Sequence, residues 1–327
     1  MDQPLKITVL AGGIGGARFL KGLRMIKNTQ ISVIANNADD ITLHGLRICP
    51  DLDSIIYNLA GVADLTRGWG RAEESWKIQE ELTKYSDEQP WFNLGDKDFA
   101  THIYRSELLR QGVPLHEIVA NLCATWGITM EILPATNDEI ETQVVLQRAL
   151  EGRPFIHFQE WWVSHRAKLP AAGFEISGIR NAQPAPGVIS AILQADVVIF
   201  APSNPVVSIG AILQINGITQ AIKETRARVV GLSPIIGASP VLGMADACLR
   251  ALGIETSSSG VAKMYGARKN GGLLDAWLIA DSDSNQCQDI EGYGLLTRAV
   301  PLLMVDDEAT ATMAKDALSL VNVEVLR

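Results

Sequence analysis

The sequence lacks the features of a membrane-spanning or nucleic-acid-binding protein. None of its apolar runs reaches the roughly 18 residues that a membrane-spanning helix needs. The formal net charge is −9, and no block of Lys and Arg with interleaved aromatic residues offsets it. These absences argue against a membrane span and against a nucleic-acid partner. The composition, with 47% hydrophobic and 20% charged residues, is ordinary for a soluble globular protein.

Cysteine is scarce, and its spacing is uninformative for metal binding. The 327 residues include four cysteines, none of which belongs to a CxxC or CxxH pair. This argues against a zinc site and favours reduced thiols in a reducing compartment. The stretch MDQPLKITVLAGG also lacks the pattern of a secretory signal, because its apolar run leads straight into glycines. We therefore expect a cytoplasmic protein.

A nucleophile motif is missing as well. The Gly-x-Ser-x-Gly pattern is absent, and no cysteine lies in a context that would activate its thiol. This absence favours a direct displacement over a covalent enzyme intermediate. Phosphoryl transfer fits such a sequence, because it depends on positioning and charge neutralisation more than on a nucleophilic side chain.

Apolar runs alternate with helical patterns, which is typical of an α/β protein with a parallel sheet. Residues 6–11 and 31–35 read as strands on either side of a helix that extends to residue 26, and residues 196–200 read as a buried strand. Further helices are predicted at residues 73–84, 99–110, 115–126 and 188–194, and further strands at 129–133, 229–232 and 302–306. In open parallel sheets, ligands lie at the carboxyl ends of the strands.

The pattern changes between about residues 142 and 174, where VVLQRAL, FIHFQEWWV and GFEI follow one another. Such runs predict a small strand-rich insertion. We therefore divide the chain into a core with a helical segment, residues 1–140 and 175–327, and a strand-rich insertion, residues 141–174.

A glycine-rich turn, GGIGGAR, follows the first strand at residues 12–18. It would let the backbone approach a ligand closely and place helix N–H groups near an anion. The turn is not a full GxGxxG fingerprint, because Arg18 occupies the third glycine position, and it is not a P-loop, because Lys21 is followed by Gly22. The turn could bind phosphate or could serve only as a tight connection between the strand and the helix, and the sequence does not decide between these two roles.

Four carboxylates crowd into residues 36–54, NNADDITLHGLRICPDLDS, just after the second strand. They are Asp39, Asp40, Asp51 and Asp53. Because nearby carboxylates repel one another, burying them calls for a hard cation with oxygen ligands, and magnesium would fit. The alternative is that Asp51 caps a helix beginning at Leu52 while Asp39 and Asp40 shape a turn.

Two further segments carry polar groups suited to an anionic substrate. In WFNLGDKDFATHIYR, Lys97, His102 and Arg105 offer nitrogen donors from a loop and the first turns of a helix. In APSNP, Ser203 and Asn204 follow the strand at residues 196–200. The alternatives are ordinary surface or core residues in the first segment and a plain strand-to-helix turn in the second.

In order along the chain, these motifs resemble the 2-phospho-L-lactate transferase family of coenzyme F420 biosynthesis. The resemblance runs from about residue 10 to residue 241 and rests on LAGGIGGARFLKGL, NNADDITLHGLRICPDLDS, RGWG with ESW after it, WFNLGDKDFATH, ILPATND, FQEWWV, APSNPVVSIGAIL and SPIIGASPV. It implies a Rossmann-like core, a homodimer and a requirement for magnesium. The implied reaction joins the deazaflavin alcohol Fo to the phosphate of a guanosine-diphosphate-activated three-carbon acid and releases GMP.

The resemblance also implies roles for individual residues. The family's acidic metal and Fo contacts fall on Asp39, Asp40 and Asp53, with Asp53 or Asp40 accepting the hydroxyl proton. Lys97 matches the basic residue of a Gly-Asp-Lys/Arg-Asp motif and would steady the substrate or the developing charge. The resemblance also implies that the glycines of the turn and the Ser-Asn-Pro loop bind the same substrates. These residues are Gly12, Gly13, Gly15, Gly16, Ser203 and Asn204.

This chain departs from the family pattern in two places, and the donor stays open. It has NADD where many members have TADD or GDD, and Leu242-Gly243-Met244 where many have Lys-Gly-Pro. Phospholactate, phosphoenolpyruvate and 3-phosphoglycerate are all possible acids. The rival readings are a non-catalytic nucleotide-binding regulator and a nicotinamide-dependent oxidoreductase; the broken GxGxxG pattern counts against the latter.

Overall fold

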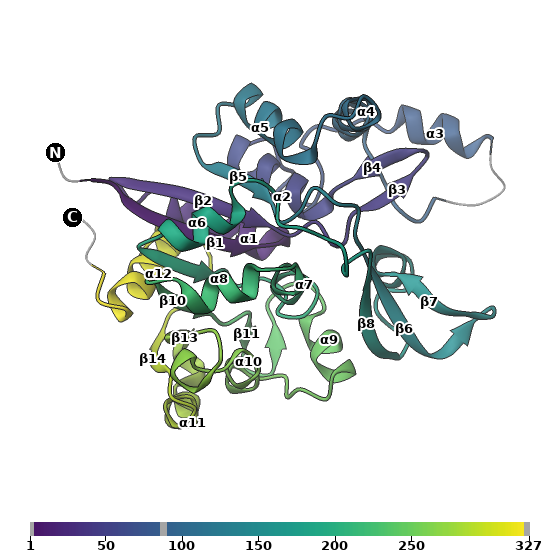
Figure 1. Cartoon of the computed structure of the whole chain (residues 1–327). Helices are drawn as coiled ribbons and strands as arrows, with labels where there is room; N and C mark the ends of the chain where they lie inside the picture. Colours follow the sequence, from purple (N-terminus) through teal and green to yellow (C-terminus); the bar gives the residue numbers. More distant parts are fainter. Residues whose placement is uncertain (1–2, 86–89, 324–327) are drawn as a thin grey trace.

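A seven-stranded parallel sheet forms the centre of the computed structural model, which describes residues 3–85 and 90–323 (Figure 1). In spatial order its strands are β14 (Leu296–Val300), β13 (Ala276–Ala280), β10 (Arg228–Leu232), β9 (Val197–Phe200), β1 (Leu5–Ala11), β2 (Thr29–Ala35) and β5 (Glu131–Pro134). All neighbouring pairs are parallel. The strand order reverses between β1 and β9, and such a switch point is where open sheets bind ligands.

Helices cover both faces of this sheet, which explains why its strands read as continuous apolar runs. One face packs against α1 (Gly13–Leu23), α2 (Pro50–Ala60), α5 (Leu115–Thr125) and α12 (Asp307–Leu320). The other packs against α6 (Val188–Gln194), α7 (Ile209–Gln214), α8 (Ile218–Glu224), α9 (Ala245–Ala251), α10 (Ser258–Tyr265) and α11 (Cys287–Gly292). Within the described ranges, no helix combines the length and apolar character needed to cross a bilayer.

Smaller elements surround the carboxyl edge of the sheet. An antiparallel hairpin, β3 (Ile41–Leu43) and β4 (Leu46–Ile48), lies inside the Asp-rich segment and packs near α4 (Asp96–Arg110), which follows α3 (Lys77–Thr83). The remaining short elements at this edge are β11 (Ile235–Ile236), β12 (Ser239–Pro240) and η3 (Asp281–Gln286). A further short helix, η2 (Arg268–Asn270), lies at the opposite edge, beside the segments that precede β10 and β13.

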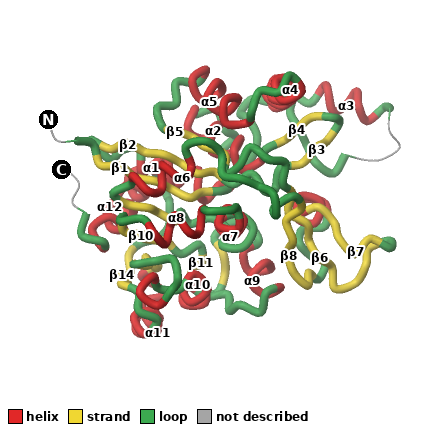
Figure 2. The backbone as a smooth tube through the Cα atoms, viewed as in Figure 1, coloured by secondary structure: helices red, strands yellow, loops and turns green. Residues whose placement is uncertain are grey.

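A separate three-stranded antiparallel sheet forms the strand-rich insertion (Figure 2). It consists of β6 (Glu141–Leu150), β7 (Arg153–His157) and β8 (Ala171–Ser177), with the short helix η1 (Glu160–Ser164) between the last two strands. Trp161 anchors a small core between this sheet and Met244 and Cys248 at α9. The predicted fold class, an α/β Rossmann-like parallel sheet with a strand-rich insertion, is confirmed.

The strand predicted at residues 302–306 is wrong. The last strand is β14, and the apolar run after Pro301 forms an irregular segment leading to α12. Leu303 and Val305 are exposed there, so the run has no covering layer. The sequence did not predict the edge strand β14, because most of its residues are only half-buried and it has no continuous apolar run.

Candidate functional site

The glycine turn and the Ser-Asn-Pro loop meet at the switch point of the sheet. Gly12 follows β1 and Ser203 follows β9, and these two strands are neighbours. The Ser203 hydroxyl accepts a hydrogen bond from the Gly12 N–H (3.0 Å) and donates one to the Gly12 carbonyl (2.8 Å). A Cβ added at Gly15 would overlap the Pro202 carbonyl oxygen, and one at Gly16 would come within 2.9 Å of the Ser203 hydroxyl. These glycines therefore allow the two loops to touch.

Asn204 shapes the second loop. Its Oδ1 accepts hydrogen bonds from the N–H groups of Val206 (2.9 Å) and Val207 (3.2 Å). Its Nδ2 faces the sulfur atoms of Met244 and Cys248. In this structure Ser203 and Asn204 thus hold the loop in place beside the glycine turn, where the resemblance implies phosphate contacts.

Asp39 and Asp51 lie on either side of one buried amide. Asn36 donates through Nδ2 to Asp39 Oδ1 (2.9 Å) and to Asp51 Oδ2 (2.9 Å). Burial raises the pKa of Asp51 to about 6, against the hydrogen bonds it accepts from Asn36 and Ser208. Burial and then the charges of Asp51 and Asp40 raise the pKa of Asp39 well above its ordinary value. Two carboxylates are therefore held close together with too little compensating charge.

Asp51, whose role the sequence left open, faces the glycine turn. It lies in the first turn of α2, which begins at Pro50 and not at Leu52. A Cβ added at Gly12 would overlap Asp51 Oδ2, and one at Gly13 would come within 3.4 Å of its Oδ1. The carboxylate thus lies against the backbone at the start of α1.

Asp40 is the carboxylate with the fewest partners. Its side chain is 1% exposed, and neither oxygen has a hydrogen-bond partner among the described residues. The nearest cation is Arg47, whose Nε lies 3.8 Å from Asp40 Oδ2. Burial raises the pKa of Asp40 to about 7, although Arg47 opposes this shift. A buried polar group without a partner is rare in native proteins and points to a functional position.

Asp53 does not join these carboxylates in the same way. Both terminal nitrogens of Arg105 donate to its carboxylate, one of them to Oδ2 at 3.1 Å. His102 Nδ1 lies 3.7 Å from Asp53, and His102 Nε2 lies 3.6 Å from Asp98. Burial lowers the pKa of His102 to about 4, so this ring is neutral near pH 7. The negative charge of Asp53 is therefore already compensated by Arg105.

His102 and Arg105 occupy a different environment from the open anion grip that the sequence suggested. Their side chains are 1% and 0% exposed, and both point toward Asp53 from α4. They do share one face of the helix, as their spacing predicted, but that face is buried against α2 and β4. Both side chains are shielded from solvent and contact Asp53, and their predicted role toward the substrate stays a prediction.

Lys97 braces a neighbouring loop. Its Nζ donates to the Ala72 carbonyl (2.9 Å) and lies 3.9 Å from Glu73. The loop in question, residues 61–76, contains the RGWG motif. Lys97 is therefore not in contact with the carboxylates, and its proposed role toward substrate stays a prediction.

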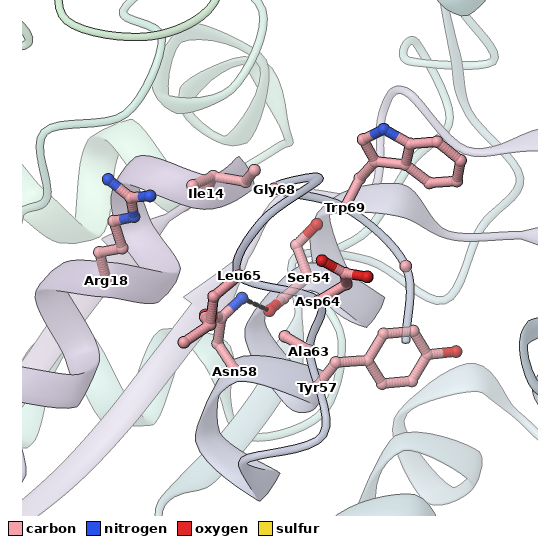
Figure 3. A pocket seen from close by; sticks show the side chains of 11 residues that line it. Ile14, Arg18, Ser54, Tyr57, Asn58, Ala63, Asp64, Leu65, Gly68 and Trp69 are labelled. Atoms are coloured by element: carbon pink, nitrogen blue, oxygen red, sulfur yellow. Dashed lines mark hydrogen bonds between the residues drawn. The ribbon is translucent and has the colours of Figure 1, made fainter. Parts of the chain in front are cut away.

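A narrow pocket opens between α1, α2 and this loop, next to the glycine turn (Figure 3). Ile14 and Arg18 reach it from α1, Ser54 and Tyr57 from α2, and Trp69 from the loop. The indole of Trp69 is 42% exposed and is flanked by the Arg67 guanidinium, 5.2 Å from its ring centre. The pocket thus places a flat aromatic surface beside the glycine turn.

Several residues of this site were not predicted from the sequence. Asn36 and Ser208 both contact Asp51, and Gln159 Nε2 donates to Asp39 Oδ2 at 2.9 Å. Gln159 belongs to the insertion and is 120 residues away from Asp39 along the chain. Its motif FQEWWV was used only to predict the strand-rich insertion and to support the resemblance, and nothing local in it signals a contact with an aspartate.

The donor set fits a hard divalent cation in its chemistry. Asp39, Asp40 and Asp51 supply carboxylate oxygens, and the pKa of each is raised by burial, which indicates that compensating positive charge is missing. In residues 3–85 and 90–323, no three side chains of His, Cys, Asp or Glu are already arranged around one point as a metal site. The carboxylates would therefore have to turn toward a cation on binding it.

Comparison with known proteins agrees with the resemblance. The family model described as 2-phospho-L-lactate transferase CofD matches residues 7–316. The phosphoenolpyruvate transferase of Nocardia farcinica is 48% identical over 322 residues, which cover 98% of this chain and 96% of that protein. The phosphoenolpyruvate transferase of Thermobifida fusca is 50% identical over 325 residues, which cover 97% and 98% of the two chains.

Two crystal structures of a protein from Bacillus halodurans share the fold. Their TM-scores are 0.62 and 0.66 at 17% and 14% identity, with 98% and 97% of this chain covered and all of theirs. At this identity the similarity concerns the fold alone. The family match, in contrast, extends over nearly the whole chain and includes both loops and the acidic segment, so the chain belongs to the 2-phospho-L-lactate transferase CofD family.

Proposed function

We propose that this transferase moves the phosphoenolpyruvyl group from its guanosine-diphosphate-activated form to the deazaflavin Fo, in coenzyme F420 biosynthesis. Similar proteins named phosphoenolpyruvate transferase, at 44–50% identity over nearly the full chain, support this donor over phospholactate and 3-phosphoglycerate. The observation that carries the proposal is a buried acidic group in which Asp51 lies against the glycine turn, Asn36 links Asp51 to Asp39, and Asp40 follows Asp39.

The chemistry is a displacement at phosphorus. The terminal hydroxyl oxygen of Fo would form a bond to the phosphorus that carries the acid, and the bond from this phosphorus to the oxygen kept by GMP would break. The hydroxyl proton would pass to a carboxylate. Asp40 suits this role, because its oxygens are unpaired and its pKa of about 7 lies near the working pH of a general base.

The guanosine diphosphate moiety would lie along the glycine turn and the Ser-Asn-Pro loop. The N-terminus of α1 has no acidic residue in its own first turn and no capping side chain, but Asp51 of α2 accepts a hydrogen bond from the Gly13 backbone. Phosphate oxygens would therefore bind to N–H groups further along this first turn. Lys97 and the exposed indole of Trp69 are on the α4 and loop side, where Fo would bind. This arrangement would bring the two substrates together over Asp40.

Magnesium is part of this proposal. Asp39 and Asp51 would hold it, and Asp40 lies next to them. We replace Asp53 by Asp51 in the ligand set, since Asp53 is already paired with Arg105. When bound, the ion would neutralise diphosphate charge. The hydrogen bonds that Asn36 donates would orient both ligating carboxylates.

We also propose a cytoplasmic homodimer. The four cysteines are free thiols, which suits a reducing compartment. The dimer follows from the family resemblance and is checked by light scattering.

Mass spectrometry of reconstituted reactions tests the transferase proposal. The purified protein would be mixed with Fo, magnesium, GTP, a guanylyltransferase and phosphoenolpyruvate, phospholactate or 3-phosphoglycerate in turn. We expect the phosphodiester with phosphoenolpyruvate, its loss in Asp40→Asn, and its retention in Asp289→Asn, which changes an exposed acid of α11. A product with another acid alone would refute the donor, and no product beside a working control transferase would refute the function.

A further inference from the structure

The inserted sheet reaches into the acidic site through the residues that follow β7. Gln159 is 5% exposed, and its Nε2 donates to Asp39 Oδ2 at 2.9 Å. Asn36 donates to the other oxygen of the same carboxylate. Both oxygens of Asp39 therefore accept hydrogen bonds from neutral amides, one following the central strand β2 and one from the insertion, and these bonds set the orientation of the carboxylate in the cation-free structure.

His157 holds the neighbouring residue. Its Nδ1 lies 3.0 Å from the N–H of Gln159 and accepts that hydrogen bond. Since a neutral imidazole with an accepting Nδ1 carries its hydrogen on Nε2, the Nε2–H donates to the Asp40 carbonyl oxygen, 3.1 Å away. One ring thus links the main chain of Asp40 with the main chain of Gln159.

Further contacts attach the inserted sheet to the same segment. The N–H of Thr142 donates to the Ala38 carbonyl, and Glu141 pairs with Arg47 at 2.6 Å. Arg47 is also the cation nearest to Asp40. The segment from Ala38 to Arg47 is therefore held by the insertion on both sides of Asp39 and Asp40.

We propose that Gln159 and His157 are positioning residues that fix the Asp39–Asp40 pair, so that the inserted sheet is a working part of the reaction site. Adjacent carboxylates repel and would turn apart without such bonds. Carboxylates that bind metals are themselves hydrogen-bonded, and loss of such a partner typically lowers metal affinity or activity about 10–100-fold. The inference rests on the proposed magnesium site for its measurable consequence.

The test compares two equivalent substitutions in the same sheet. Gln159→Met keeps the length of the side chain and removes the donor to Asp39. Gln147→Met makes the same change in β6, where the amide donates to the Ala171 carbonyl. Binding of Mn²⁺ to the substrate-free proteins is measured by electron paramagnetic resonance, together with kcat, KM and thermal melting.

We expect Gln159→Met to weaken Mn²⁺ binding about 10-fold or more and to lower kcat with a smaller change in the KM of the nucleotide donor. Gln147→Met should behave as the parent protein. His157→Phe should resemble Gln159→Met, and His157→Gln should recover part of the loss, because its amide can again donate to Asp40.

Unchanged Mn²⁺ affinity in both Gln159→Met and His157→Phe would overturn the proposal, as would a parent protein that binds no Mn²⁺. The metal measurement needs no substrate. A parent that binds Mn²⁺ tightly and transfers no group would therefore count against the proposed function alone, while the comparison of the variants still decides the role of Gln159.

Discussion

Replacing Asp40 by Asn should make the substrate-free protein more stable while abolishing transfer. Asp40 is fully buried, has no hydrogen-bond partner among the described residues and lies 3.8 Å from Arg47. Asn removes the charge at nearly the same volume. Arg47 keeps its closer partner Glu141, at 2.6 Å, so the substitution does not strand a buried cation.

The size of the effect follows from the pKa of Asp40. Burial raises it from the ordinary 3.8 to about 7, so ionising this carboxyl in the folded protein costs about 4 kcal/mol more than in the unfolded chain, at about 1.36 kcal/mol per pKa unit. The buried amide of Asn would reduce this gain in folding stability by about 1–3 kcal/mol, because the amide also lacks a hydrogen-bond partner. A net gain of about 1–3 kcal/mol remains at pH 8, equivalent to a melting temperature higher by roughly 2–6 °C.

The gain should depend on pH in a defined direction. Because the pKa of Asp40 is higher in the folded state, the folded protein keeps a proton that the unfolded chain loses between about pH 4 and pH 7. Stability of the parent therefore falls as pH rises through this window and levels off above it. Asp40→Asn removes this contribution, so its advantage over the parent should grow by about 2–3 kcal/mol between pH 5 and pH 8.

Thermal unfolding of both proteins without divalent cations, at pH values from 5 to 8.5, measures this difference. Asp39, Asp51 and Asp98 also have raised pKa values and titrate in both proteins. Because the charge of Asp40 helps to raise the pKa of Asp39, the difference between the two proteins contains the titration of Asp40 and its coupling to Asp39. Melting curves of parent and variant that stay parallel across the pH range would refute the reasoning. So would a variant that is less stable than the parent at pH 8.

Three other predictions follow from the site. Arg105→Met should destabilise the protein by about 3–5 kcal/mol in urea unfolding, because it leaves the charge of Asp53 buried without its partner; a loss below about 1 kcal/mol would contradict this. Gly15→Ala should weaken GDP binding about 10-fold or more in calorimetry, because its Cβ would push against the Pro202 carbonyl, whereas Gly292→Ala, in open space, should bind as the parent does. Removing divalent cations with EDTA should stop turnover and leave the circular dichroism spectrum unchanged, with activity restored by Mg²⁺ or Mn²⁺; persistent turnover would refute the metal requirement.

The sequence located the acidic segment but did not show how different the surroundings of Asp51 and Asp53 are. Residues 51 and 53 are two positions apart, which corresponds to about 200° around a helix, so they face nearly opposite sides of α2. Asp51 therefore faces the glycine turn, and Asp53 faces α4 and Arg105. The choice of Asp53 came from the family resemblance. A helix predicted to begin at Leu52 instead of Pro50 gave no reason to compare the directions of the two side chains.

The sequence predicted helices and strands well where the residues of a single element determine its structure. Helix α6 has the predicted bounds of Val188–Gln194, and the strands at the centre of the sheet were found from their apolar runs. The contact from Gln159 to Asp39 depends instead on how the insertion docks on the core, which no spacing in a single segment contains. For the same reason, the burial of His102 and Arg105 could not be read from their shared helix face.

Because β1 pairs with β9, the site can form only late in the synthesis of the chain. Gly12 donates a hydrogen bond to Ser203, and Ser208 donates one to Asp51. About two-thirds of the chain must therefore leave the ribosome before the two loops can meet. Until then, the β1 edge that later pairs with β9 has no partner, and such edges invite association with other chains. A fragment that ends before residue 197 should therefore lack both the site and the means to protect that edge.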